Sequence, residues 1–182
     1  VVAGLALAPA LAFIAAWWTW RAGFEAWQKW PLLGIGIGLA FLAGGWIVYD
    51  LLCRSPLGRR EPILAAVMLV LCAVAAYALT QLYSGRGAYI HFGAMLGTIM
   101  TANVFFVIMP GQREMVRARV EGRAPDPMHA ARGKQRSVHN TYFTLPVLFI
   151  MLSNHYSFTY AHPQNWLILI GMMFAGAAIR QF

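Results

Sequence analysis

The chain has 182 residues, of which 60% are apolar and 11% are charged. Soluble domains carry roughly 25% charged residues, so this composition excludes a soluble globular fold. The formal net charge is +8. A basic balance can indicate nucleic-acid binding, but in so apolar a chain membrane orientation and anionic lipid explain the cations more simply, and we expect no nucleic-acid partner.

Uncharged runs of membrane length separate the charged residues. A bilayer core of about 30 Å requires about 20 residues of helix. The longest run, 137–179, is interrupted by the polar stretch 155–165 and is therefore interpreted as two spans. Continuous apolar runs without alternation exclude a β-barrel. In chain order, the sequence predicts six transmembrane helices at 1–20, 32–53, 63–83, 88–109, 140–158 and 165–182.

These elements predict an all-α, polytopic membrane bundle that forms one transmembrane domain over residues 1–182. The hydrophilic stretch 110–138 is expected to extend the fourth span helically, until Gly122, Pro125 and Pro127 break it. Because the chain begins with Val1 and its last predicted span ends at Phe182 without a polar flank, we expect a fragment of a longer polypeptide.

The cations are concentrated in alternate loops. Ten of the 14 Lys and Arg residues lie between the second and third spans or between the fourth and fifth. The positive-inside rule predicts that these loops, including the basic loop at 110–138, are cytoplasmic. That loop either contacts lipid headgroups or helps to bind an anionic substrate.

Two histidines are predicted at the end of the bundle away from the basic loops. His91 lies near that end of the fourth span and His155 near that end of the fifth. Two inward-facing imidazoles at similar depth could ligate a haem iron or another redox metal. The alternative is that each forms a hydrogen bond across a helix interface. Cys53 and Cys72 are interpreted as packing residues, without a disulfide.

A second polar set is predicted at the basic end. Arginine and amide side chains there could donate directional hydrogen bonds to a planar anionic heterocycle. The alternative is a cluster that satisfies helix-end carbonyls and reaches lipid phosphates. Asp50 precedes Arg54 by four residues, which predicts an ion pair along one helix. The candidate residues are Asn103, Gln112, Arg113, Lys134, Arg136 and His139, with Asn140 beside them.

Three sequence blocks, GWIVYDLLCRSPL, IMTANVFFVIMPGQR and QRSVHNTYFTLPVLFIMLSNH, resemble the membrane domain of the bacterial cytochrome-c-linked urate oxidases, also called urate hydroxylases. The resemblance covers about residues 32–182. It implies a domain of eight helices that oxidises urate to 5-hydroxyisourate in purine degradation. It also implies electron transfer to haem c on a C-terminal or partner cytochrome c domain, and a bacterial inner-membrane location in the lipid bilayer.

From their depth and chemistry, we expect His91 and His155 to be catalytic or haem-ligating residues, and the basic-end set to contact urate. The two sets lie at opposite ends of helices about 30 Å long, so one pocket cannot use both. Either urate binds near the two histidines, or electrons cross the membrane through a further cofactor such as haem b. A purine or anion transporter and a cytochrome b-like electron carrier are the alternative functions.

Overall fold

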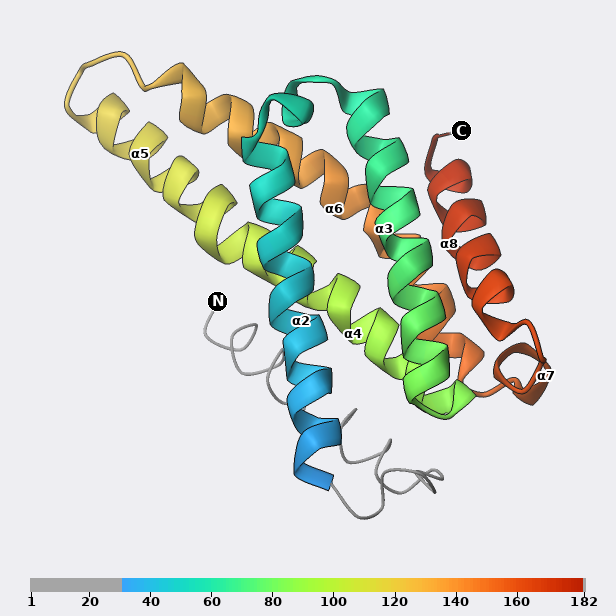
Figure 1. Cartoon of the computed structure of the whole chain (residues 1–182). Coiled ribbons are helices and arrows are strands. Elements are labelled where there is room, and N and C mark those ends of the chain that lie inside the picture. Colours follow the sequence, from blue (N-terminus) through green and yellow to red (C-terminus); the bar gives the residue numbers. More distant parts are fainter. Residues whose placement is uncertain (1–30, 182) are drawn as a thin grey trace.

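A computed structural model describes residues 31–181, so the first predicted span, 1–20, lies outside the described residues. Within the described part of the chain, every regular element is helical (Figure 1). The elements are α2 (Pro31–Arg54), η1 (Pro56–Arg59), α3 (Glu61–Leu82), α4 (Gly85–Asn103), η2 (Val104–Ile108), α5 (Met109–Val120), α6 (Pro127–Ser153), α7 (Ser157–Tyr160) and α8 (Asn165–Gln181).

Three of these helical segments are long and apolar enough to cross a membrane: Leu32–Arg54, Glu61–Leu82 and Gly85–Val120. They correspond to the second, third and fourth predicted spans. The prediction of six transmembrane helices is not confirmed. Helices α6 and α8 occupy the positions of the last two predicted spans, but α6 begins within the charged segment and α8 has only 17 residues.

Helices α4 and α5 are joined without a break by a single π-helical turn, η2. Pro110 stands at the start of α5. Proline has no N–H to donate, and its ring clashes with the carbonyl four residues earlier. A π turn widens the helix at this point and accommodates the clash. The turn begins directly after Asn103, a residue of the site described below.

The hydrophilic stretch 110–138 is helical over most of its length instead of forming a long loop. As predicted, the fourth span continues as a helix to Val120 and is then broken. Gly122 adopts a φ of 68°, a left-handed conformation that suits glycine. Asp126 then caps α6 by accepting a hydrogen bond from the Met128 N–H at 2.8 Å. Helix α6 therefore returns alongside α5 (Figure 1).

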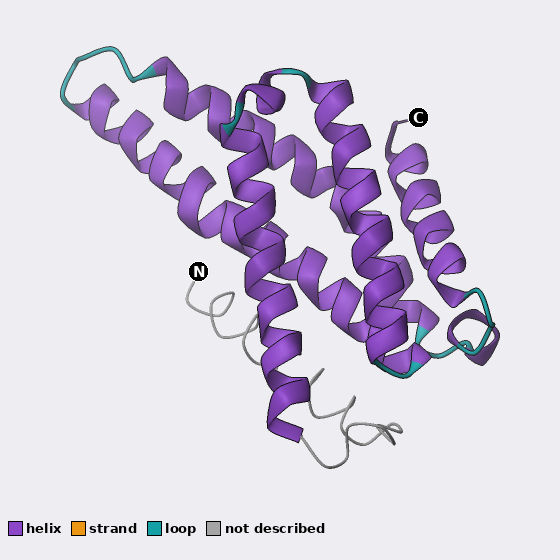
Figure 2. Cartoon of the chain, viewed as in Figure 1, coloured by secondary structure: helices purple, strands orange, loops and turns teal. Residues whose placement is uncertain are grey.

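The order of the helices places all the predicted basic segments at one end. In Figure 2, η1, the connection between α5 and α6, and the C-terminal end of α8 lie at that end. Gln135 of α6 confirms part of this arrangement by donating to the carbonyl oxygen of Gly58 in η1 at 2.7 Å. We call this the basic end; the opposite end holds the turn between α3 and α4 and helix α7.

Close helix contacts rely on glycine at several points. A Cβ on Gly38 of α2 would lie 2.4 Å from Nε2 of His91 in α4, and one on Gly45 would lie 2.7 Å from Cγ of Met95. Helix α8 approaches α6 in the same way, since a Cβ on Gly176 would lie 2.8 Å from the ring of Pro146. Small residues thus allow α2 and α8 to pack against the central helices α4 and α6.

Candidate functional site at the basic end

A buried ion pair anchors a polar network at the basic end. Nη2 of Arg136 on α6 donates to Oδ1 of Asp50 on α2 at 2.8 Å, and the two side chains are only 3% and 10% exposed. Arg54 also pairs with Asp50 at 2.6 Å, which confirms the predicted ion pair along α2. This contact fixes α6 against α2, because separating the two helices would leave a buried charge without its partner.

Arg136 determines the direction of the hydrogen bonds that follow. Arginine only donates, so the 3.3 Å bond from its Nη1 must end on the carbonyl oxygen of Asn103. The amide nitrogen of Asn103 is then left to donate to the hydroxyl oxygen of Tyr49 at 3.1 Å and to Oδ1 of Asn140 at 3.0 Å. Asn140 in turn donates to the carbonyl oxygen of Met100 at 3.0 Å.

The chain of bonds continues from Tyr49 to a second carboxylate. The Tyr49 hydroxyl oxygen, which accepts from Asn103, also lies 2.8 Å from Nδ1 of His139. Because the Glu61 carboxylate only accepts, neutral His139 carries its proton on Nε2, which lies 3.1 Å from Oε2 of Glu61. Its Nδ1 then accepts the hydrogen bond from the Tyr49 hydroxyl. Gln135 holds the other Glu61 oxygen with a 2.9 Å bond.

Exposure rises steadily along this chain. Tyr49 is 1% exposed, the His139 side chain 14% and the Glu61 side chain 60%. The guanidinium carbon of Arg136 lies 4.7 Å from the centroid of the Tyr49 ring. The phenol is therefore held on one side by a cation and on the other by an imidazole whose second nitrogen reaches a solvent-exposed carboxylate.

A cavity of about 1020 Å³ opens beside this chain, between α3, α6 and α8. Its walls are mainly apolar, which is typical of small-molecule sites that hold a few oriented polar groups. With Tyr142 and Gln181, which close the cavity beside the end of α8, the polar lining residues among those described number seven; the five nearest the chain of hydrogen bonds are Tyr49, Glu61, Lys134, Gln135 and His139.

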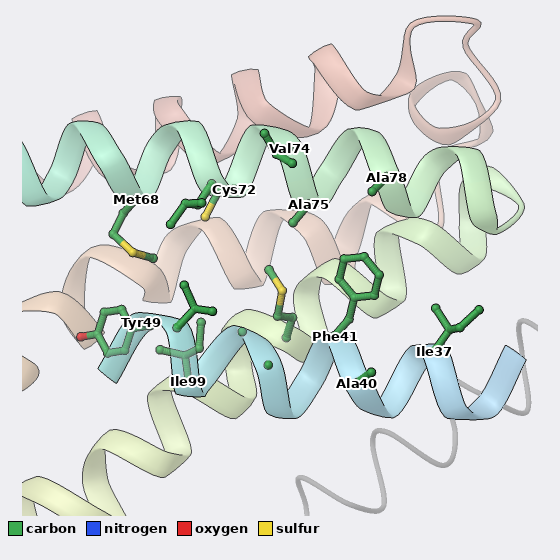
Figure 3. A pocket seen from close by; sticks show the side chains of 15 residues that line it. Ile37, Ala40, Phe41, Tyr49, Met68, Cys72, Val74, Ala75, Ala78 and Ile99 are labelled. Carbon is green, nitrogen blue, oxygen red and sulfur yellow. The ribbon is translucent and has the colours of Figure 1, made fainter. Parts of the chain in front are cut away.

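A second cavity, of about 420 Å³, lies between α2, α3 and α4 and is lined almost entirely by apolar side chains. Tyr49 borders both cavities. In Figure 3 its ring faces the apolar side chains of the smaller cavity, while its hydroxyl oxygen points away from them. The polar function of Tyr49 is therefore directed away from the smaller cavity.

The structure brings together part of the predicted basic-end set. Asn103 and Arg136 are directly bonded, and His139 joins them through Tyr49. Lys134 lines the large cavity, whereas Asn103 and Arg136 are buried behind it. The remaining two candidates, Gln112 and Arg113, are exposed on α5 beyond the π turn and do not line the cavity.

Sequence reasoning missed Tyr49, Glu61 and the second partner of Asp50. Each contact joins residues far apart in the chain: 90 positions separate Tyr49 from His139, and 86 separate Asp50 from Arg136. The sequence carries one signal for Glu61. An acidic residue is costly near a membrane, and Glu61 stands at the start of an apolar helix, so a functional or structural partner is expected for it. Asp50 was assigned only its neighbour along the helix.

At the opposite end, the two predicted histidines do not form a common site. His91 is buried, stacks on the ring of Tyr83 with centroids 4.6 Å apart, and faces Gly38 of α2. Helix α6, which leads to His155, meets α4 at Gly93, about 200° around the helix from His91. His155 itself is exposed in the turn after α6.

This packing does not fit a haem held between the two side chains, because Tyr83 covers the His91 ring and α2 lies against its Nε2. Among residues 31–181, no group of three or more His, Cys, Asp or Glu side chains could hold a metal ion. Cys72 is buried in the apolar core, whereas Sγ of Cys53 lies 4.0 Å from Nδ1 of His139, at the edge of the basic-end network.

Taken together, the all-helical architecture of the described residues and the three helices long and apolar enough to cross a membrane indicate a helical membrane protein. The family model described as Urate oxidase N-terminal matches residues 4–182, and the chain belongs to this family. The resemblance found in the three sequence blocks is thereby confirmed. No curated protein and no solved structure matched the chain.

Proposed function

We propose that this protein is a membrane-bound urate oxidase that converts urate to 5-hydroxyisourate and passes the electrons to a cytochrome c domain or partner. Membership of the urate oxidase N-terminal family supports the substrate. The structural observation that carries the proposal is the large cavity at the basic end, with a cation and a hydrogen-bonded imidazole in its wall.

The cavity suits a planar, anionic heterocycle. Its apolar walls accommodate the faces of the ring, while Lys134 supplies a positive charge and Gln135 an amide at the rim. His139 is held by two hydrogen bonds and is therefore fixed in orientation. Asn103 and Arg136 do not line the cavity and act on it through Tyr49.

The family resemblance implies haem c on a cytochrome domain or partner, which would accept the electrons when bound. The described residues supply binding, orientation and proton transfer. With urate at the basic end, the electrons must cross the membrane through a further cofactor. The packing around His91 does not fit a haem between His91 and His155, so that cofactor would be held elsewhere and no step of this mechanism passes through a haem at that position.

The test is urate-dependent reduction of cytochrome c in membranes that contain the protein. We expect reduction by the wild type and loss of most of it in His139→Gln. His129→Gln is the matched control, because His129 lies on the same helix but does not line the cavity, and it should retain wild-type activity.

Two outcomes would overturn the proposal. A folded wild-type protein that does not oxidise urate excludes the oxidase function. Uptake of labelled urate without any redox change would instead identify a transporter.

A further inference from the structure

Oxidation of urate at this site must release a proton as well as electrons. Urate monoanion and water give 5-hydroxyisourate, one proton and two electrons. The two electrons go to two ferric haems of cytochrome c, the one-electron acceptor of the proposed function, and each haem takes one electron. The proton must leave a cavity with mainly apolar walls, where an unpaired charge is costly.

The described residues contain a hydrogen-bonded path that leads from the cavity to solvent. The Nε2 proton of neutral His139 is oriented toward the Glu61 carboxylate, so Nδ1 accepts from the Tyr49 hydroxyl. Each donor therefore points outward, from a phenol that is 1% exposed to a carboxylate that is 60% exposed.

We propose that Tyr49, His139 and Glu61 form a proton-exit relay from the cavity to solvent, with Tyr49 as the catalytic residue and Glu61 as a positioning residue. The proposal rests on the proposed oxidation of urate and assigns roles to Tyr49 and Glu61, which the sequence had not indicated. The Glu61–His139 pair orients the imidazole in the way that a carboxylate orients histidine in other catalytic triads.

In the transfer step, a water molecule adds to C5 of the oxidised ring. A C–O bond forms as the π bond between C5 and the adjacent ring nitrogen opens, and its electron pair moves to that nitrogen. One O–H bond of the water breaks, and its proton goes to the Tyr49 oxygen. At the same time the Tyr49 hydroxyl proton moves to Nδ1 of His139. His139 then releases its Nε2 proton to Glu61, from which it passes to bulk water.

This exchange avoids a buried phenolate, because Tyr49 gains one proton as it gives up another. The transient positive charge forms on His139, where the Glu61 carboxylate lies 3.1 Å away. Asn103 and Arg136 keep the Tyr49 oxygen and ring in place, so they are positioning residues for the relay. Tyr49 is among the residues that line the cavity where the water would add.

The experiment measures kcat and KM for urate-dependent cytochrome c reduction, together with binding of a purine analogue that cannot be oxidised. We expect Tyr49→Phe to lower kcat by about 100-fold, because a positioned proton acceptor contributes about 10²–10⁴-fold. KM and analogue binding should stay unchanged. Glu61→Gln should lower kcat less, with a larger solvent deuterium isotope effect. Added imidazole should restore part of the Glu61→Gln rate.

Tyr89→Phe is the matched control, since Tyr89 is equally buried but lies at the opposite end and bonds only to backbone oxygens in the contacts found here. Wild-type kcat in Tyr49→Phe, loss of analogue binding in that variant, or an equal loss of kcat in Tyr89→Phe would each overturn the relay. Glu61 is exposed, so Glu61→Gln tests the relay even if Tyr49→Phe fails to fold. A wild-type protein without urate oxidation would instead overturn the proposed function.

Discussion

The two ends of the bundle use buried tyrosines in different ways. At the basic end, the Tyr49 hydroxyl is bonded to the side chains of Asn103 and His139. At the opposite end, the Tyr83 hydroxyl donates to the carbonyl oxygen of Gly34, and Tyr89 donates to those of Thr159 and Asn165.

The hydrogen-bond partners therefore distinguish tyrosines that stabilise the fold from a tyrosine that can transfer a proton. A hydroxyl that donates to a backbone carbonyl satisfies a helix end or turn and has no titratable partner in that bond. The Tyr83 hydroxyl, for example, is used as a donor to the carbonyl oxygen of Gly34. At the basic end, by contrast, the hydroxyl lies between an amide donor and an imidazole, and its proton has an acceptor.

The largest expected effect concerns the ion pair that fixes the basic end. Arg136→Met leaves Asp50 with only the exposed Arg54 and should lower the free energy of unfolding by about 3–5 kcal/mol. The double variant Asp50→Leu with Arg136→Met should recover part of that loss, because both charges are then removed. Thermal unfolding in detergent measures both effects; equal stabilities of wild type and Arg136→Met would contradict the anchoring role.

A smaller effect is expected where α8 closes the wall of the large cavity. Gly176→Ala places a Cβ against the ring and backbone nitrogen of Pro146, neither of which can move freely, and should destabilise the protein by about 1–3 kcal/mol. Gly171→Ala on the same helix meets no atom within 4 Å and should be neutral or slightly stabilising. The thermal unfolding midpoints of the two variants are compared, and equal midpoints would show that α8 does not rely on this contact.

A substitution at the opposite end should change the stability of the protein and leave kcat unchanged. Tyr89→Phe leaves its buried carbonyl partners with one donor fewer and should lower the free energy of unfolding by about 1–2 kcal/mol. Its kcat for urate should equal that of the wild type. A changed kcat in a well-folded Tyr89→Phe protein would break the distinction between the two ends.

The smallest expected effect concerns the cation at the cavity. Lys134→Ala should raise KM for urate by about 2- to 5-fold with kcat unchanged, because exposed charge pairs contribute only about 0.2–1 kcal/mol. Arg132→Ala removes the same charge from the same helix outside the cavity and should leave KM unaltered. Steady-state kinetics at constant ionic strength compares them, and matching KM values would exclude a specific role for Lys134.

Much of the fold could be predicted because membrane helices follow from local composition. The second, third and fourth spans were located to within a few residues at most of their ends, and the break at Gly122 was also predicted. The predicted contact between the end of the fourth span and the start of the fifth is confirmed at Asn103, Arg136 and Asn140. The π turn at η2 was not predicted, because Pro110 alone indicates a disruption but not its form.

The sequence by itself determined the helical membrane class, the clustering of cations and the residues with which the basic-end network begins, since charge and hydropathy are properties of each segment alone. Only the tertiary structure decided which polar residues meet. It turned His91 toward α2 and away from α6, and it joined Glu61, His139 and Tyr49 across three helices. Such contacts depend on how each helix is rotated about its own axis. That rotation is set by close packing at glycines such as Gly38 and Gly176, and the pattern of charges along the sequence carries no information about it.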